Sequence, residues 1–310
     1  MGVSPKYVIG VDIGGTKTRI VTAPADDADG AALEDLTVAS SAWRGGLGDP
    51  RSDAIGLHRL IVDRLGPSAL AAALAVGAHG CENTRQCREL EDALRTRFSG
   101  PVIVVNDSEL MAPAMGIPEG IGLVVGTGSI ATARSAEGEL LTAGGWGWLL
   151  GDEGSAPALV REATRAVLAA LDRGEPLDRL GRRLMAAFGV QDAAGLALAV
   201  TDGAAATAWG DHAPEVFAAA DEGSSTAQEV IRQAGVQLAL LVQRIRQRGV
   251  PWDTVVAGGA VIERQPRLQA ALYDAVESAT PSIRLRILSQ PPVVGAVALA
   301  RRSAARSENT

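Results

Sequence analysis

The feature that most constrains the fold is an internal repeat of a strand, a turn built from Gly and Thr, and a second strand. The first copy reads YVIGVDIGGTKTRIVT from Tyr7 to Thr22, and the second reads GLVVGTGSIATARS from Gly122 to Ser135. Each copy joins two apolar runs through a glycine turn, which is the pattern of a β-hairpin. The repeat predicts a duplicated architecture with two similar halves. A cleft between two such halves is the expected place for a ligand.

Strands and helices alternate along the chain, which predicts an α/β fold. A third apolar run, PVIVVND at 101–107, also reads as a buried strand that ends in an acid. Amphipathic stretches at 52–66 and 84–98 carry apolar residues at helical spacing. Beyond Ser155 the pattern predicts helices at 156–174, 178–189, 226–249, 267–279 and from about 291, with strands at 253–260 and 282–289.

Composition excludes several classes of partner. The chain has 310 residues, which is enough for two domains of about 150 residues each. Its 29 Lys and Arg against 36 Asp and Glu give a net charge of −7, and no basic cluster with interleaved aromatic residues is present, so we expect no nucleic-acid partner. The two cysteines, Cys81 and Cys87, and the three histidines form neither a C-x-x-C nor an H-E-x-x-H motif, which argues against structural zinc or a disulfide framework.

Membrane and targeting signals are not expected either. The first six residues lack the apolar core of a signal peptide, and Lys6 departs from the myristoylation pattern. The alanine-rich run from Ala69 to Ala78 is too short to cross a bilayer, which takes about 20 residues. The sequence therefore predicts a cytoplasmic protein without a membrane partner.

The first glycine turn has the composition of a phosphate cradle. It follows Asp12 and consists of Gly14, Gly15, Thr16, Lys17 and Thr18. Glycines let successive backbone N–H groups converge on an anion, and Thr hydroxyls add donors. A Walker A loop needs Gly and Lys side by side before Ser or Thr, whereas Thr16 intervenes here. A plain hairpin turn is the alternative interpretation.

Two further glycine elements suit a nucleotide. The run Gly126, Thr127, Gly128, Ser129 formally opens a G-x-G-x-x-A dinucleotide fingerprint, but the alternation of the following residues predicts a strand where that fingerprint needs a helix. We therefore interpret it as a second phosphate-binding hairpin, with hydroxyls from Thr127 and Ser129. Gly258 and Gly259 end a predicted strand and open a helix, where backbone can approach a base or ribose closely. A simple strand-to-helix connector is equally compatible with that turn.

Together, the D-x-G-G-T of 12–16, the strand-end Asp107, the GTGS of 126–129 and the AGG of 257–259 resemble the sugar kinase, heat-shock ATPase and actin superfamily. More closely, GTGSIATA at 126–133 and GGWGWLLGDEGSA at 144–156 resemble the N-acetylglucosamine kinases of the BadF/BadG ATPase family. The resemblance implies two ribonuclease-H-like, actin-like ATPase domains around an interdomain cleft, with the last helix returning to the first domain. The expected domains are 1–115 plus 292–310 and 116–291, and the expected assembly is a homodimer.

The resemblance also implies roles for individual residues. Residues 14–18 would hold the β- and γ-phosphates of ATP, and Asp12 would face Mg²⁺. Gly126, Thr127, Gly128 and Ser129 would make the second phosphate contact. The adenosine pocket would be lined by Gly258, Gly259 and Ala220. The expected sugar-binding residues are Trp43, Asn106, Asp107, Gly145, Trp146, Asp152 and Glu153.

Asp107 is the predicted catalytic base, and its position supports that role independently. Phosphoryl transfer needs positioning, charge neutralisation and one carboxylate that orients and deprotonates the attacking hydroxyl. A carboxylate at the end of an apolar strand is held rigidly, and general-base help is worth typically ~10²–10⁴-fold. The alternative is that Asp107 only caps the helix that starts near Ser108.

The sequence predicts how the sugar is recognised. An aromatic face packs on the apolar side of a pyranose while carboxylates accept hydroxyls, which suits Trp146 and Asp152. We expect Trp148 and the following two leucines, more than Trp146, to plug into the core.

Ser41 stands where N-acetylglucosamine kinases have an Asn, two residues before Trp43, and His79 and Glu82 stand where the family usually has small residues. A charge-assisted bond from an ammonium at C2 to a carboxylate is worth about 1.5–3 kcal/mol. Burial of an acetyl methyl is worth about 0.8 kcal/mol. The acid pair and the missing Asn favour phosphorylation of glucosamine at its 6-hydroxyl, with N-acetylglucosamine as the alternative.

Two other classes remain open on sequence grounds. A reductase-activating ATPase of the same family would need cysteines that hold an iron–sulfur cluster between subunits, and Cys81 and Cys87 lack a glycine-flanked cluster loop. A sugar-responsive regulator would normally bring a helix-turn-helix segment, whereas this chain opens on its first strand.

Overall fold

The computed structural model describes residues 7–27, 32–46, 49–66, 71–202 and 209–308. It confirms an α/β chain with two five-stranded sheets. The first sheet has the order β3-β2-β1-β4-β5, and the second has β10-β9-β6-β7-β8. If each half is counted from its own first strand, the two orders are the same, so the predicted duplication is confirmed. The first six residues and 69–70 of the alanine-rich run lie outside the described residues.

The chain divides into two compact units. The first consists of Met1–Gly122, Ala133–Leu141 and Leu288–Thr310, and the second consists of Leu123–Thr132 and Thr142–Ile287. The predicted domain division at 115/116 and 291/292 stays a prediction. Each unit is described by itself below.

The first sheet brings three strand ends to one edge. Its strands are β1 (Tyr7–Ile13), β2 (Lys17–Pro24), β3 (Glu34–Ala39), β4 (Ala71–Ala78) and β5 (Val102–Val105). β2 runs antiparallel to both β1 and β3, whereas β1, β4 and β5 are mutually parallel. The carboxyl ends of β1, β4 and β5 therefore lie side by side, which is where α/β sheets bind their ligands.

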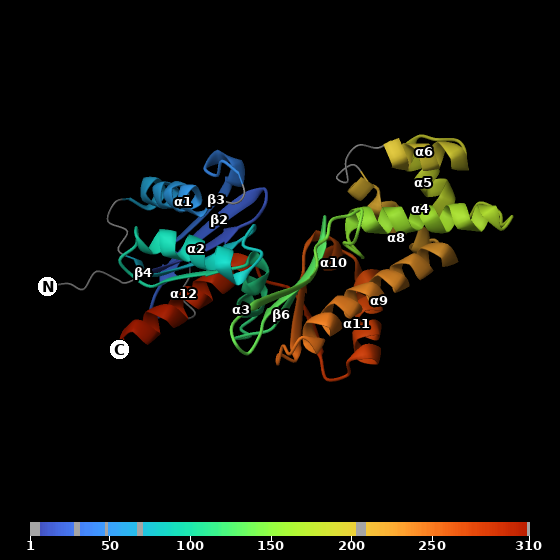
Figure 1. Ribbon diagram of the computed structural model, residues 1–310. Helices are drawn as coiled ribbons and strands as arrows, with labels where there is room; N and C mark the ends of the chain where they lie inside the picture. The colour runs from blue at the N-terminus through green and yellow to red at the C-terminus, as the bar shows by residue number, and fades with distance from the viewer. Residues whose placement is uncertain (1–6, 28–31, 47–48, 67–70, 203–208, 309–310) are drawn as a thin grey trace. The chain divides into compact units, whose positions relative to one another are not determined.

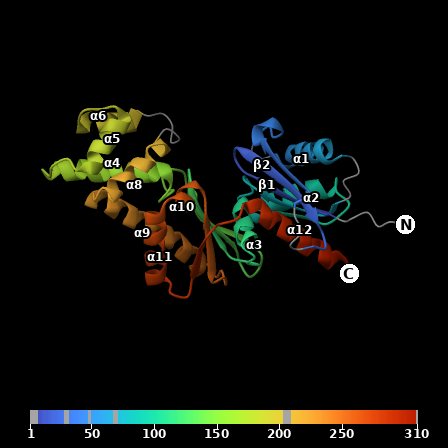
Figure 2. The same ribbon diagram turned by 180° about the vertical axis from the view of Figure 1, so that it is seen from behind.

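Both faces of this sheet are covered, because side chains alternate across a strand. On one face Ile9, Val11 and Ile13 pack with helices α1 (Pro50–Leu65) and α2 (Thr84–Arg95). On the other, Val8 and its neighbours pack against α12 (Pro292–Glu308), which lies along β1 and β4 in both views (Figures 1 and 2). The expected return of the last helix to the first unit is thus confirmed. The short elements η1 (Ser40–Ala42), η2 (Asp107–Leu110) and α3 (Met111–Ala114) complete the unit.

The second sheet consists of β6 (Ile121–Val125), β7 (Ser129–Arg134), β8 (Leu140–Gly144), β9 (Thr254–Gly258) and β10 (Arg284–Ile287). The helices that follow are α4 (Ala156–Asp172), α5 (Arg179–Phe188), α6 (Ala193–Asp202), α8 (Ala213–Asp221), α9 (Ser225–Gln247), α10 (Ala260–Arg264) and α11 (Pro266–Ala279). Figures 1 and 2 both show α9 and α11 side by side. The strand β7 begins at the end of the GTGS run, where a dinucleotide-binding fingerprint would need a helix. The interpretation of this run as a hairpin turn is therefore confirmed.

The described helices are short or polar relative to a membrane-spanning segment, which takes about 20 apolar residues. No single one is long and apolar enough to cross a bilayer, although α5 and α6, bent by 55° from each other, pass the length and composition test as a pair.

The helix α12 packs closely against Leu110 and Ala114 at Gly295. A Cβ added at Gly295 would lie 2.0 Å from the Leu110 carbonyl oxygen, so an alanine there forces backbone apart. We expect Gly295→Ala to lower the free energy of unfolding by about 1–3 kcal/mol through overpacking, despite alanine's higher helix propensity. Urea unfolding of the purified protein measures the effect.

The matched control is Gly210→Ala, where the nearest atom to an added Cβ lies at 3.4 Å, an ordinary contact. It should leave the unfolding free energy nearly unchanged. A Gly295→Ala protein as stable as the wild type would contradict the packing described for α12.

Candidate functional site

Three polar side chains follow the three parallel strands of the first unit. Asp12 lies at the end of β1, His79 follows β4, and Asp107 follows β5. The His79 backbone N–H donates to the Ile13 carbonyl at 2.8 Å, and His79 Nδ1 lies 3.9 Å from Asp107 Oδ2. Parallel pairing thus gathers residues that are far apart in sequence at one sheet edge.

The two carboxylates at this edge interact with each other. Burial, helped by the Asp107 charge and opposed by Arg19, raises the pKa of Asp12 to about 7. Burial also raises the pKa of Asp107, while His79 and the Ser108 N–H act to lower it. A carboxyl group with a raised pKa binds a proton more readily than usual, which suits a general base.

The cap of η2 decides between the two interpretations of Asp107. Asn106 is the N-cap: its side chain accepts from Ser108 N, and Glu109 reaches back to the Asn106 N–H, which completes a capping box. Asp107 Oδ1 also accepts from Ser108 N at 3.0 Å, but the side chain is 31% exposed. The capping role therefore belongs to Asn106, and the Asp107 carboxylate still reaches solvent.

The polar side-chain atoms of Asn106 are bonded within the protein. It is buried, its Oδ1 accepts from Ser108, and its Nδ2 donates to the Cys81 carbonyl at 3.1 Å. These contacts hold the loop, and the expected contact of Asn106 with the sugar stays a prediction.

The first glycine turn exposes Gly15, Thr16 and Lys17, with Gly14 N donating to the Lys17 carbonyl at 2.9 Å. This surface is available to an anion. Thr18 is different because it is fully buried. Its hydroxyl is 3.0 Å from Ser40 Oγ and accepts from Trp43 Nε1 at 3.0 Å, so the expected hydroxyl contact to phosphate is replaced by a contact that braces the turn.

Trp43 is anchored more tightly than the sequence suggested. Its indole N–H is bound to Thr18, and its ring packs with the core beneath α1. Next to it, the Arg44 guanidinium pairs with buried Asp53 at 2.6 Å and donates to the His79 carbonyl at 2.9 Å. These contacts fix the loop that carries exposed Ser41 against the His79 backbone.

The second unit presents its own turn. Gly126 N donates to the Gly128 carbonyl at 2.9 Å, which repeats the closure seen at Gly14, and Thr127 is exposed. The Ser129 hydroxyl instead donates to the Glu153 carbonyl at 2.8 Å and is buried. Ser129 therefore connects the turn to the 144–156 segment, and its expected contact with phosphate stays a prediction.

The late glycine pair packs against this turn's strand. Gly258 ends β9, and Gly259 has φ of +113° as the N-cap of α10. A Cβ on Gly259 would lie 2.6 Å from the Val125 carbonyl oxygen, so only glycine fits. Ala220 is fully buried near the end of α8, and its expected place in the adenosine pocket stays a prediction.

The segment from Gly144 to Ala156 separates its two tryptophans. Trp146 is 75% exposed, and Gly145 is exposed beside it. Trp148 packs edge-to-face on Trp209 with ring centroids 4.6 Å apart, as expected for a core plug. Leu149 and Leu150 are exposed, so the expectation that they plug into the core is wrong.

Asp152 combines an unusual backbone angle with an unsatisfied carboxylate oxygen. Among the described residues it is the one non-glycine residue with positive φ, at 55°. Its side chain lies against Gly128, and its Oδ1 is buried without a hydrogen-bond partner in the described part of the chain. Strain and an unsatisfied carboxylate oxygen concentrate where a structure is built for a ligand. The assignment of Asp152 and Glu153 to a sugar stays a prediction, with Asp152 the better placed.

His79 is the residue that sequence reasoning undervalued. A single histidine among small residues gave no signal beyond its departure from the family pattern. Its ring lies 3.6 Å from a Cβ built on Gly15 and within reach of Asp107, so it joins the glycine turn to the proposed base.

The model of the BadF/BadG/BcrA/BcrD ATPase family matches residues 9–300. The chain belongs to this family. A curated relative, the N-acetylmuramic acid/N-acetylglucosamine kinase of Clostridium acetobutylicum, is 35% identical over 182 residues, which is 55% of this chain and 56% of the relative.

Solved structures agree on the actin-like ATPase fold. A candidate N-acetylglucosamine kinase from Chromobacterium violaceum is 27% identical with a TM-score of 0.64, covering 96% of this chain and 99% of that one. A ROK-family glucokinase from Streptomyces griseus, solved with glucose and AMPPNP, is 19% identical with a TM-score of 0.51, covering 96% and 99%. This chain therefore shares its fold with a ROK-family glucokinase.

The state of Asp152 generates a prediction with a defined pH dependence. Burial raises the pKa of Asp152, so its ionisation at neutral pH opposes folding. We expect Asp152→Asn to raise the free energy of unfolding at pH 7, because asparagine tolerates positive φ and carries no charge. The gain should shrink as pH falls toward about 4, because Asp152 takes up its proton in the folded state at higher pH than it does in the unfolded state.

Urea unfolding between pH 4 and pH 8 measures the difference. Asp63→Asn, which changes an exposed carboxylate on α1, is the control and should leave the unfolding free energy nearly unchanged. Equal or lower stability of Asp152→Asn at pH 7 would refute the account of Asp152.

Proposed function

We propose that the protein is an ATP-dependent kinase that phosphorylates the 6-hydroxyl of an amino sugar. The observation that carries this proposal is the partly exposed carboxylate of Asp107 beside His79 and the exposed glycine turn, within one unit. Family membership supports ATP as the nucleotide. Two relatives named as N-acetylglucosamine kinases support the sugar class.

In this proposal Asp107 orients the 6-hydroxyl and accepts its proton as the oxygen attacks the γ-phosphorus. The N–H groups of residues 15–17, with the Lys17 and Thr16 side chains exposed beside them, bind phosphate oxygens. Phosphoryl transfer gains mostly from such positioning and charge neutralisation. Thr127, Gly128 and Gly259 are proposed nucleotide contacts of the second unit.

The acidic edge fits a magnesium ion. No three His, Cys, Asp or Glu side chains converge as a metal site among the described residues. Magnesium needs only one or two protein carboxylates when phosphates and water complete its shell. Asp12, a carboxylate whose raised pKa reflects burial and a second acid, would hold the ion. When bound, the ion neutralises charge on the β- and γ-phosphates.

The sugar's C2 substituent is the finer part of the proposal. The preference for glucosamine rested on Ser41 and on the acid pair, but Asp152 lies against Gly128 and receives backbone N–H groups of Ser129 and Gly147. That placement favours a hydroxyl-orienting role over an ammonium site. We therefore propose N-acetylglucosamine as the preferred substrate and glucosamine as the alternative.

The reductase-activating alternative is disfavoured by the cysteines. Cys81 and Cys87 are free and buried, at 4% and 2% exposure, inside the first unit. Cysteines that hold a cluster between two subunits must reach the surface. The predicted homodimer and cytoplasmic location stay predictions.

The proposed activity is tested by ADP release with ATP, Mg²⁺ and each of glucosamine, N-acetylglucosamine, N-acetylmannosamine and glucose. We expect the highest kcat/KM with N-acetylglucosamine. Asp107→Asn should lower kcat by about 10²–10⁴-fold because the general base is lost.

Asp63→Asn, an exposed carboxylate on α1, is the matched control and should keep full activity. Absence of turnover with every sugar would refute the kinase proposal. Full activity of Asp107→Asn would refute the role of Asp107, and preference for glucosamine would reverse the C2 assignment.

A further inference from the structure

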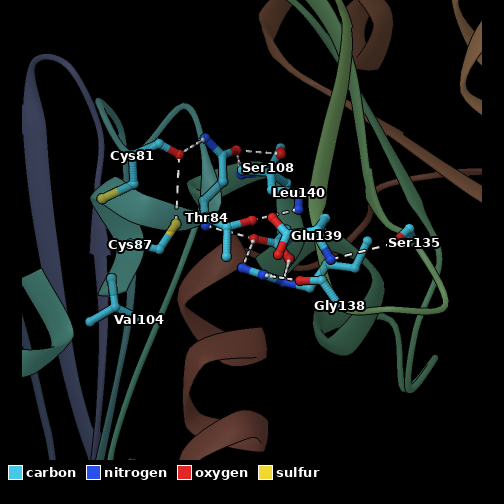
Figure 3. A network of polar contacts seen from close by, with 12 residues as sticks. Cys81, Thr84, Cys87, Val104, Ser108, Ser135, Gly138, Glu139 and Leu140 are labelled. Carbon is cyan, nitrogen blue, oxygen red and sulfur yellow. Dashed lines mark hydrogen bonds and ion pairs between the residues drawn. The ribbon is translucent and has the colours of Figure 1, made fainter. Parts of the chain in front are cut away.

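A polar network includes the residues on either side of Asp107 in the chain, and nothing in the proposed chemistry accounts for it (Figure 3). It links the cap of η2 to the hairpin between β7 and β8, and all of the members used here belong to the first unit. Its central pair is Glu109 and Arg134, 25 residues apart in the chain.

The Glu109 carboxylate contacts both the Asn106 backbone and the Arg134 side chain. Its Oε1 accepts from the backbone N–H of Asn106 at 2.8 Å, which is the return half of the capping box. Both of its carboxylate oxygens also accept from Arg134, with Nε to Oε2 at 2.6 Å and Nη2 to Oε1 at 3.0 Å. The bidentate pair is mostly buried, with side chains 27% and 13% exposed, so geometry and charge both fix the carboxylate.

Arg134 is itself anchored at the hairpin. Its Nη1 donates to the Gly138 carbonyl at 2.8 Å, which closes the turn between β7 and β8. The far side of the hairpin is held to α2, where the Leu140 N–H donates to Thr84 Oγ1 at 2.8 Å (Figure 3). The guanidinium is therefore held in one position by its contacts with Glu109 and with the hairpin.

The other side of the cap is held by the loop after β4. Asn106 Nδ2 donates to the Cys81 carbonyl, and Cys87 Sγ donates to the same oxygen at 3.8 Å (Figure 3). Asn106 is therefore fixed from both directions, by Glu109 at its N–H and by Cys81 at its amide. The residue that follows it is Asp107.

We propose that Glu109 and Arg134 are positioning residues that set the orientation of the Asp107 carboxylate for phosphoryl transfer. This inference rests on the proposed function of Asp107. The Glu109 carboxylate holds the Val105–Asn106 peptide through the Asn106 N–H, and the Glu109 backbone N–H donates to the Asn106 carbonyl at 3.0 Å, which holds the Asn106–Asp107 peptide. Arg134 fixes the direction of the Glu109 carboxylate. A displacement of about 1 Å at a reacting group can cost ~10²-fold in rate, so loss of this pair should act on turnover more than on binding.

The test compares Arg134→Met, Arg134→Lys, Glu109→Gln and the double variant Glu109→Gln/Arg134→Met. We expect Arg134→Met to lower kcat by about 10–100-fold, with KM for sugar and for ATP within about threefold of wild type. Arg134→Lys should recover part of kcat, because a single charged donor still reaches Glu109. The double variant should be no slower than Arg134→Met, because both residues act through one contact.

Amide hydrogen exchange of residues 106–109 gives a readout that does not depend on turnover. Exchange there should accelerate in Arg134→Met and stay unchanged in Arg232→Met, which removes an exposed ion pair with Glu229 on α9. Arg232→Met should also keep wild-type kcat and KM.

The outcomes distinguish failure of the positioning role from failure of the proposed function. Wild-type kcat in a folded Arg134→Met protein, or unchanged exchange at 106–109, overturns the positioning role while leaving the proposed function intact. A parallel rise of both KM values with unchanged kcat also overturns it. No turnover by the wild-type protein with any sugar overturns the proposed function, and the exchange comparison then still decides whether Arg134 holds the loop.

Discussion

Parallel pairing of β1, β4 and β5 is the constraint on which the rest of the first unit depends. It places the ends of three strands at one edge, and each strand is followed by a residue that can carry charge: Asp12, His79 and Asp107. The sheet needs both faces covered to stay folded, and α1, α2 and α12 supply that cover. The edge is thereby rigid while the side chains beyond it remain accessible. A second sheet with the same strand order repeats the turn but carries a different loop, which contains Trp146 and Asp152.

Polar residues near the site divide into those that face solvent and those that hold the backbone. Asn106, Thr18 and Ser129 are buried, and each is bonded to a neighbouring segment. Thr16, Lys17 and Thr127 are exposed on the turns, and Asp107 is partly exposed. Buried polar groups need partners, so the first group fixes the loops that present the second. Function and folding thus use adjacent residues of the same motifs for different purposes.

Local patterns predicted most of the strands, the two hairpins and the long helices, because apolar periodicity and glycine turns are short-range signals. The strand β4, AAALAVGA, was missed because alanine carries little strand preference, and its place is set by the neighbours β1 and β5. The same limit explains the site. The motif identified Asp107, but the burial of Asn106 and the exposure of Leu149 and Leu150 depend on contacts with distant segments. The position of His79 beside Asp107 could not be predicted from the sequence, because it depends on how the strands pair in the sheet.

The most direct measurement is a crystal structure of the protein with N-acetylglucosamine and a non-hydrolysable ATP analogue. The account predicts the sugar's 6-hydroxyl oxygen at about 2.6–3.2 Å from the Asp107 carboxylate, a hydrogen-bond distance suited to proton transfer. It also predicts the terminal phosphate on the backbone of residues 15–17. A sugar bound with its 6-hydroxyl away from Asp107, or a phosphate bound elsewhere, would contradict the account.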